Sequence, residues 1–365
     1  MNVAFIGPFS GSPTGQSIAL DSAFKCKLYN GKKFDLGGED VYFLKKIYLA
    51  IKNIFLVIFW LYSYLNRTEL VLYITNSRSL LGFYREIPYF LIAKIFNVPL
   101  VTHLHGADFN IFFESLGYLN RKLVRFCYNI PKVNIVLNER MRKEYSCLGI
   151  NVSTTVIPNF VDLSFVDSVN KNDLNKKFDI NNIKVIFLSN LLEDKGIFEL
   201  LYGYLQCSDD VKSRISINIV GKPMFKNKSS LKNFFDLLDA TNGKVIYKGP
   251  KYNQDKWSEL LSSDILILPT YYATEAFPLV FLEAAASGCF ILTTKHNYLE
   301  SVLSDFYCNF FEPKSSSEVS RVFTEMTRNL NTLTLGKENN FLISKRYSKS
   351  FYESNLLDVF QSVLE

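Results

Sequence analysis

The strongest constraint on the fold is an alternation of short apolar runs with longer segments whose apolar residues recur at helical spacing. In the first half of the chain the apolar runs occupy 2–7, 70–75, 99–106, 133–138 and 154–159. Segments such as IPYFLIAKIF and RKLVRFCYNI lie between them. Strands that alternate with helices build parallel βαβ units, so the pattern predicts an α/β protein with a doubly wound parallel sheet.

The alternation breaks once, in a stretch rich in Asn, Asp and Lys at 160–182, and then restarts. The second series of apolar runs is KVIFLSN, ISINIVG, KVIYKG, DILILPT and CFILTT, and the tail 345–365 has the spacing of one long helix. A chain of 365 residues exceeds the usual size of a single core. We therefore predict one domain over 1–165, a second over 166–347, and a terminal helix over 348–365 that returns to the first.

The excess positive charge lies in the first half, because residues 1–165 hold 18 Lys and Arg against 11 Asp and Glu, whereas the remainder holds 23 against 24. A basic, aromatic half is compatible with a membrane surface or a polyanion as partner, and equally with a solvated surface that has none. The six cysteines include no C-x-x-C pair, which predicts no zinc site and fits a reducing cytosol. The first residues are typical of a strand and not of a signal peptide.

The segment 47–65 approaches the length of a transmembrane helix. It contains Lys52 and Asn53, and an apolar run typical of a buried strand follows it at 70–75. A core helix or a membrane-surface helix accounts for both facts, so this is the expectation.

The segment Thr274 to Gly288 carries the clearest chemical signal. It follows an apolar strand, Pro278 suits the first position of a helix, and Gly288 suits its end. A helix that begins at the carboxyl end of a strand offers unpaired N–H groups to a diphosphate. Glu275 and Glu283, on either side of this helix start, can accept hydrogen bonds from the vicinal hydroxyls of a sugar and of a ribose respectively.

The alternative is that Glu275 caps the helix and Glu283 is only exposed. Apolar residues flank Glu283 on this helix, and an unpaired carboxylate in such surroundings is costly. We therefore favour ligand binding by both.

The spacing Glu275-AFPLVFL-Glu283 resembles the E-x7-E motif of the retaining GT-B glycosyltransferases of family 4, and the similarity extends through PTYY before it and EAAASG after it. Weaker signatures occur in the order of that family along nearly the whole chain. The resemblance implies two Rossmann-like domains that face a cleft. It also implies a retaining, metal-independent transferase of the hexosyltransferase type that needs no cofactor besides its donor.

In the first half, the resemblance implies that Gly15, in GSPTGQS, contacts the donor phosphate, and that His105, in HLHGADF, orients the donor sugar as a catalytic residue. His103 and His105 alternate along a strand end and so share a face. His103 and Asp108 are expected at the acceptor, although Asp108 could instead cap a helix. The only further histidine is His296, which leaves no third ligand for a metal.

In the second half, Lys195 of FLSNLLEDKGIFELL matches the lysine that neutralises the donor diphosphate, and it joins His105 and Glu275 as a catalytic residue. The family's arginine is replaced by Asn190, whose amide carries no charge. Either Lys195 and the helix start suffice, or another basic residue reaches in. The remaining residues that we expect around the donor are Gly221, Lys248, Gly249, Ala276, Phe277, Pro278 and Leu279.

Since no carboxylate nucleophile is evident, we expect a front-side reaction in which the leaving diphosphate is stabilised electrostatically. The family implies a nucleotide-sugar donor, UDP-linked in the first instance. It implies a saccharide acceptor, lipid-linked, in the synthesis of cell-surface polysaccharide such as lipopolysaccharide O-antigen or capsule. The protein would then be cytoplasmic, peripheral on the inner face of the cell membrane, with no nucleic-acid partner.

Two other functions stay open. A GT-B sugar-nucleotide epimerase would need an additional acid/base set that the sequence does not show. A non-catalytic scaffold anchored through 47–65 would not need Glu275, Glu283, Lys195 and His105, all of which are present.

Overall fold

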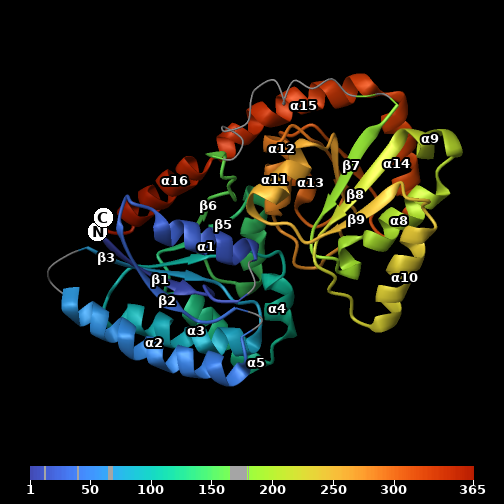
Figure 1. Ribbon diagram of the computed structural model, residues 1–365. Helices are drawn as coiled ribbons and strands as arrows, with labels where there is room; N and C mark the ends of the chain where they lie inside the picture. Colours follow the sequence, from blue (N-terminus) through green and yellow to red (C-terminus); the bar gives the residue numbers. More distant parts are fainter. Residues whose placement is uncertain (12–13, 39–40, 65–68, 165–178, 180) are drawn as a thin grey trace. The chain divides into compact units, whose positions relative to one another are not determined.

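The computed structural model describes residues 1–11, 14–38, 41–64, 69–164, 179 and 181–365 (Figure 1). The chain forms two compact units, the first built from Met1–Phe160 with Ser350–Glu365 and the second from Val161–Lys349. Each unit contains a six-stranded sheet in which every strand pair is parallel. The predicted fold class is therefore confirmed. Most of the predicted linker 160–182 lies outside the described residues.

The sheet of the first unit has the strand order β2-β1-β3-β4-β5-β6. Its strands are β1 (Asn2–Gly7), β2 (Asn30–Asp35), β3 (Leu70–Thr75), β4 (Leu100–His103), β5 (Val133–Val136) and β6 (Thr154–Val156). Its helices are α1 (Gly15–Lys25), α2 (Phe43–Tyr64), α3 (Leu80–Ile95), α4 (Phe109–Ser115), α5 (Tyr118–Tyr128), η1 (Glu139–Leu148) and α16 (Lys349–Ser362). After β1 the chain forms β2 on one side of β1, and then β3 on the other side of β1. The direction of winding therefore reverses between β1 and β3.

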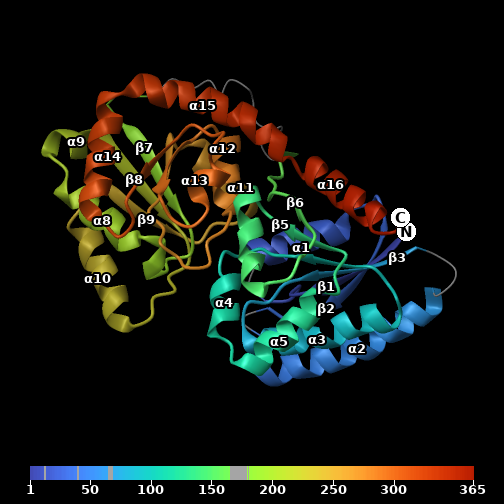
Figure 2. The same ribbon diagram turned by 180° about the vertical axis from the view of Figure 1, so that it is seen from behind.

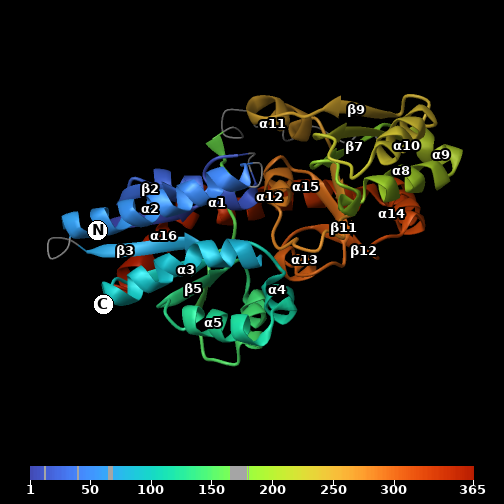
Figure 3. The same ribbon diagram turned by 90° about the horizontal axis from the view of Figure 1, so that it is seen from below.

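The two faces of this sheet are covered by different helices. Alternate strand residues, among them Phe5 and Tyr73, face α1 and α16, and the ring centroid of Phe360 in α16 lies 6.1 Å from that of Phe5 and 5.7 Å from that of Tyr73. Helices α2 and α3 cover the opposite face (Figures 1 and 2). The last helix of the chain thus completes the core of the first unit, and both termini belong to this unit (Figure 3).

Within the described residues, α2 is the one helix long and apolar enough to cross a membrane by length and composition. One side of it is packed: Val57 and Leu61 are buried, and the Asn53 side-chain amide donates to the backbone oxygen of Asp35 at 2.6 Å. The other side exposes large apolar residues such as Phe55 and Phe59. The packed side belongs to the core of the first unit, and contact of the exposed side with a membrane stays a prediction.

The sheet of the second unit has the order β12-β11-β10-β7-β8-β9. Its strands are β7 (Ile183–Leu188), β8 (Ile215–Val220), β9 (Val245–Gly249), β10 (Ile265–Leu268), β11 (Phe290–Thr294) and β12 (Cys308–Phe311). Its helices are η2 (Glu193–Lys195), α8 (Ile197–Gln206), α9 (Asp209–Arg214), α10 (Lys228–Asp239), α11 (Asn253–Leu261), α12 (Leu279–Ala286), α13 (Leu299–Val302), α14 (Ser316–Arg328), α15 (Leu330–Ser344) and η3 (Lys345–Tyr347). Here the winding reverses between β7 and β10, with α8, α10 and α14 on one face and α11 and α12 on the other (Figures 1 and 2).

The sequence pattern does not predict strands β2 and β12, and both lie at the edges of their sheets. An edge strand has only one neighbour and often carries charged residues that discourage further pairing. In β2, Lys32 and Lys33 are exposed while Phe34 is buried, so the apolar run that marks a central strand is missing.

Candidate active site

In the second unit, the structure joins two of the predicted catalytic residues. Lys195 ends η2 after β7, and Glu275 lies in the loop after β10. These strands are paired neighbours, so their carboxyl ends open on the same edge at the point where the winding reverses, which is where open α/β sheets bind ligands. The Lys195 ammonium forms an ion pair with Glu275 Oε2, and the two side chains are only 13% and 9% exposed.

The two loops that carry this pair are bonded to each other. The backbone N–H of Tyr271 donates to the backbone oxygen of Asp194 at 2.8 Å, and the Thr270 hydroxyl donates to Glu275 Oε2 at 3.1 Å. From the loop after β11, the Asn297 side-chain amide donates to the backbone oxygen of Glu275 at 3.0 Å. The carboxylate of Glu275 is therefore held by Lys195 and Thr270, and its backbone by Asn297, before any ligand arrives.

Helix α12 begins directly after this loop, as predicted, and Gly288 follows it with a φ of 75°. Pro278, which suits the first helical position, instead precedes the helix. With a ψ of 127°, Pro278 is still extended, so the helical conformation starts at Leu279. Ala276 and Phe277 are buried before the helix start, and the Phe277 ring lies edge-on to Tyr347 at 5.9 Å.

The alternative reading of the two glutamates is wrong. Glu275 is not the cap of α12, because Pro278 occupies that position without a side-chain bond. Glu283 is only 16% exposed and pairs with Lys256 Nζ of α11 at 2.5 Å. As expected, the carboxylate in this apolar helix has a partner, and in this structure the partner is Lys256. A ribose that bonded to Glu283 would share the carboxylate with that lysine.

Other predicted donor residues lie at the same edge of the sheet. Asn190 follows β7 and is exposed, Gly221 follows β8, and Lys248 and Gly249 end β9. Gly221 has a structural reason to be glycine, since a Cβ there would lie 1.8 Å from the backbone oxygen of Ser189. Its N–H donates to the backbone oxygen of Gly249 at 3.1 Å, which joins the two turns.

In the first unit, His103 and His105 stack with ring centroids 4.0 Å apart, so they share a face as predicted. His103 Nδ1 lies 2.6 Å from the Tyr73 hydroxyl, and the residue has no exposed surface. An acceptor could therefore reach His103 only if its neighbours moved, and the expected contact stays a prediction. In this structure His103 packs against the ring of His105.

Both ring nitrogens of His105 are buried and lack a hydrogen-bond partner among the described residues. Burial, with a smaller contribution from the charge of Arg78, lowers the pKa of His105 to about 3. The imidazole is therefore neutral at pH 7, and it offers a ligand one donor and one acceptor nitrogen.

Asp108 precedes α4 at the capping position but makes no side-chain capping bond. Its Oδ1 instead lies 3.1 Å from Arg78 Nε as an ion pair. Gly15 is the first residue of α1, and a Cβ there would meet no described atom within 4 Å. Packing within the unit thus does not require a glycine at that position, and its predicted donor contact stays a prediction.

Sequence reasoning missed Thr270, Asn297 and Arg78. All three follow buried parallel strands, so the rule that ligands bind at the carboxyl ends would have found them. Across the described ranges, no three His, Cys, Asp or Glu side chains gather as a metal site requires. Metal independence itself stays a prediction.

Two family models match the chain, one described as "Glycosyl transferases group 1" over 170–340 and one as "Glycosyltransferase Family 4" over 44–165. No curated protein sequence matches it. Among solved structures it is similar to Anabaena Alr3699/HepE in complex with UDP, at 17% identity and a TM-score of 0.75 over 99% of this chain and 100% of that one. A glycosyltransferase from Rickettsia africae matches at 14% identity and a TM-score of 0.74 over 100% and 98%. The sucrose-phosphate synthase of Thermosynechococcus elongatus matches at 12% identity and a TM-score of 0.73 over 99% and 98%.

Proposed function

We propose, on the premise that this chain is a glycosyltransferase of the GT-B fold, that it transfers a sugar from a UDP-sugar to a saccharide acceptor with retention of anomeric configuration. The observation that carries the proposal is the buried pair of Lys195 and Glu275 where the winding of the second sheet reverses. The proposed place is the cytoplasmic face of a membrane, and the proposed pathway is the assembly of cell-surface polysaccharide.

In this reaction the bond between the anomeric carbon and a diphosphate oxygen breaks, and a bond to the acceptor oxygen forms on the same face. The acceptor's proton passes to the leaving phosphate oxygen, so no base from the protein is required. Lys195 would stabilise the negative charge that develops on the diphosphate, together with the N–H groups at the start of α12. Glu275, held by Thr270 and Asn297, would accept hydrogen bonds from the sugar hydroxyls.

His105 would orient the donor sugar as a neutral hydrogen-bonding group. Its two ring nitrogens lack partners among the described residues, and buried polar groups of this kind are normally bonded. The low pKa of His105 excludes a charged imidazole at neutral pH.

UDP is the proposed nucleotide because Anabaena HepE, with the same fold, has been solved in complex with UDP and with UDP-glucose. At 17% identity this similarity concerns the fold alone. The proposal therefore needs a direct test with several nucleotides.

A membrane-associated acceptor is proposed from the exposed face of α2. Five apolar side chains of this helix are 62–78% exposed and recur at helical spacing: Leu44, Tyr48, Phe55, Phe59 and Tyr62. The lysines at 45 and 52 are exposed on the same helix. An apolar stripe accompanied by lysines fits the surface of an anionic lipid bilayer.

The donor is tested by thermal unfolding in the presence of UDP-, GDP- and other nucleotide-sugars, followed by release of the free nucleotide. A ligand at 100 times its Kd stabilises by about 2.7 kcal/mol, which raises Tm by several degrees. Lys195→Ala and Glu275→Ala should each lower turnover at least about 100-fold. The matched control Lys232→Ala, at an exposed lysine of α10, should leave it unchanged. Near-normal rates in both site variants would refute the assignment.

The stereochemistry is tested by NMR of the product. The same anomeric configuration in donor and product is expected, and inversion would refute the front-side route. An epimerised sugar nucleotide, formed without an acceptor, would favour the epimerase instead.

The membrane surface is tested by flotation with vesicles that contain anionic lipid. Wild-type protein should float, and the variant Phe55→Ser/Phe59→Ser should float several-fold less. The control Leu335→Ser/Leu342→Ser removes two side chains of α15 that are 57% and 58% exposed. If both double variants float equally, α2 is not the contact.

A further inference from the structure

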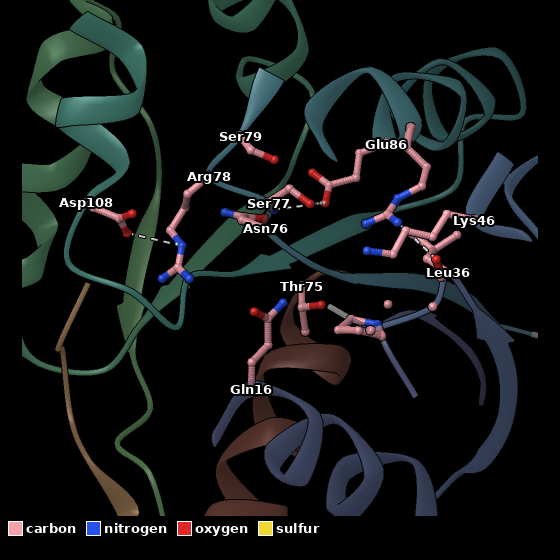
Figure 4. Close-up of a pocket in the computed structure, with 15 residues that line it drawn as sticks. Gln16, Leu36, Lys46, Thr75, Asn76, Ser77, Arg78, Ser79, Glu86 and Asp108 are labelled. Atoms are coloured by element: carbon pink, nitrogen blue, oxygen red, sulfur yellow. Dashed lines mark hydrogen bonds and ion pairs between the residues drawn. The ribbon is translucent and has the colours of Figure 1, made fainter. Parts of the chain in front are cut away.

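A cavity of about 280 Å³ opens in the first unit at the carboxyl ends of β1, β2 and β3 (Figure 4). Gly7 ends β1, Leu36 follows β2, and Thr75 ends β3, and all three line the cavity. Because the winding of this sheet reverses between β1 and β3, the cavity occupies the ligand-binding position of a doubly wound sheet. Only the positions of these strand ends could have indicated the cavity from the sequence.

The walls of the cavity are held by hydrogen bonds within the unit. Asp35 Oδ1 accepts from the backbone N–H groups of Phe9 at 2.9 Å, Ser10 at 3.2 Å and Gly37 at 2.9 Å. A Cβ on Gly38 would lie 2.3 Å from the backbone oxygen of Ser10, so these loops can approach so closely only because residue 38 is a glycine. The cavity is therefore formed before a ligand binds.

Three cationic side chains line the cavity: Lys46, Arg78 and Arg85. In Figure 4, Arg78 lies on one side and Lys46 on the other, with Asn76 and Ser77 between them. Arg85 donates through Nη1 to the backbone oxygen of Leu36 at 3.0 Å, while its buried Nε lacks a partner among the described residues. A buried guanidinium nitrogen without an acceptor is costly unless a ligand supplies one.

Two acidic residues also line the cavity within the described part of the chain, Asp108 and Glu86. Asp108 pairs with Arg78 and accounts for one cation. Glu86 is buried, with Oε1 bonded to the N–H of Ser77 at 2.9 Å and also to the Ser77 hydroxyl. Burial raises the pKa of Glu86 to about 7, although Ser77 and Arg85 act against the shift, so the carboxyl is partly protonated at neutral pH. In that form its O–H can donate to an anion.

We propose that this cavity binds a phosphate or diphosphate group, and that the acceptor of the transferase carries that group. Two guanidinium groups and one ammonium around one cavity match the several oxygens of a phosphate or diphosphate, whereas a carboxylate has only two. The N-terminal end of α3, where Ser79 caps the helix, contributes further positive potential. That the ligand is an acceptor rests on the proposed transferase function, whereas the anion site itself does not.

The test uses the full chain and inorganic pyrophosphate as the probe, with saturating UDP present so that the nucleotide site is filled. Calorimetry gives the Kd of pyrophosphate for the wild type, Arg78→Gln, Arg85→Gln and the control Arg140→Gln, an exposed arginine of the same unit. Arg78→Gln and Arg85→Gln should each weaken binding at least about tenfold, and Arg140→Gln should leave it unchanged. UDP should stabilise all four proteins equally, which shows that each is folded.

Farnesyl diphosphate, with farnesol as its control, separates two sources of the group. If farnesyl diphosphate binds the wild type about ten times more tightly than pyrophosphate does, and Arg78→Gln abolishes this difference, the result supports a lipid-linked diphosphate. Equal affinities support a phosphate carried by a soluble saccharide.

Two results would overturn the site: pyrophosphate that fails to bind while UDP does, or pyrophosphate that binds Arg78→Gln and Arg85→Gln as tightly as the wild type. The proposed donor fails separately, if UDP and UDP-sugars stabilise none of the proteins.

Discussion

Lys195 and Glu275, 80 positions apart in the sequence, form a buried ion pair that joins the loops after two neighbouring strands, β7 and β10. Each residue therefore positions the other before a donor arrives. A diphosphate would form an ion pair with Lys195 as well. Glu275 would keep the hydrogen bond from the Thr270 hydroxyl to its carboxylate and the one from the Asn297 amide to its backbone oxygen. The pair is thus positioned within the second unit in advance, as electrostatic stabilisation in the proposed reaction would require.

This relationship predicts strong coupling in a double-mutant cycle of Lys195→Met and Glu275→Gln. Each single variant leaves one poorly exposed charge without its partner, which costs up to about 3–5 kcal/mol of unfolding free energy. The double variant should be destabilised by clearly less than the sum of the two, as measured by urea unfolding. Additive effects within about 0.5 kcal/mol would show that the pair does not form.

Gly196, next to Lys195, provides a test of how tightly this site is built. Its φ is 80°, and a Cβ would lie 2.1 Å from the backbone oxygen of Pro269, so Gly196→Ala should cost at least about 3 kcal/mol. Gly243 has a similar φ of 76° with no described atom within 4 Å, so Gly243→Ala should cost only the backbone strain, about 1 kcal/mol. Equal losses in thermal unfolding would show that the approach to Pro269 is not close.

His105 predicts a pH dependence of stability. Its pKa is about 3 in the folded protein against 6.5 in the unfolded chain, so between these values the unfolded chain binds the extra proton. Stability should therefore fall as pH falls from 6.5 towards 3, by up to about 1.4 kcal/mol per pH unit for this residue. Urea unfolding of His105→Phe should show a shallower slope than the wild type below pH 6.5, and the same slope at pH 7–8. Parallel curves at low pH would contradict the burial of the imidazole.

Glu86 predicts a pH dependence of stability in the opposite direction to that of His105. Its pKa is raised to about 7 from 4.5, so its contribution to stability is complete below pH 4.5 and is lost as pH rises through 7. Glu86→Gln keeps an acceptor oxygen for Ser77 and removes the ionisation. Relative to the wild type, the variant should gain about 2–3 kcal/mol between pH 5 and pH 8 in unfolding free energy. A constant difference across this range would refute the shift.

Gly106 allows Arg78 to be displaced without removing it. A Cβ on Gly106 would lie 1.0 Å from Arg78 Nη1, the far end of a flexible side chain. Gly106→Ala should therefore cost little stability, about 1 kcal/mol or less, while it weakens pyrophosphate binding as strongly as Arg78→Gln does. Gly117→Ala, where a Cβ meets no described atom within 4 Å, is the control. Tight pyrophosphate binding by Gly106→Ala would show that the position of Arg78 is unimportant.

The central strands and the fold class could be predicted because buried parallel strands are continuous apolar runs, as β3 and β10 illustrate. The motif around Glu275 could also be recognised, since a loop and the helix after it are local in sequence. The edge strand β2 could not, because its exposed lysines hide the apolar pattern.

The ion-pair partners of Glu275 and Glu283 could not be predicted, because ion pairs depend on which loops and helices the fold brings together. Lys256 shares no motif with Glu283, and only the packing of α11 beside α12 reveals the pair. Burial is equally a property of the folded chain. His103 and His105 look equivalent in the sequence, yet His103 bonds to Tyr73 through Nδ1, whereas neither ring nitrogen of His105 has a partner among the described residues.

The position of α16 also bears on how the protein is made. Part of the first unit's core, including Tyr352 and Phe360, is encoded after the whole of the second unit. The second unit is continuous over Val161–Lys349, so it can fold while translation continues. The first unit, in contrast, can complete its core only after α16 has been synthesised. A nascent chain that stops near residue 349 would therefore hold a continuous second unit, while Phe5 and Tyr73 of the first sheet would lack their contacts with Phe360.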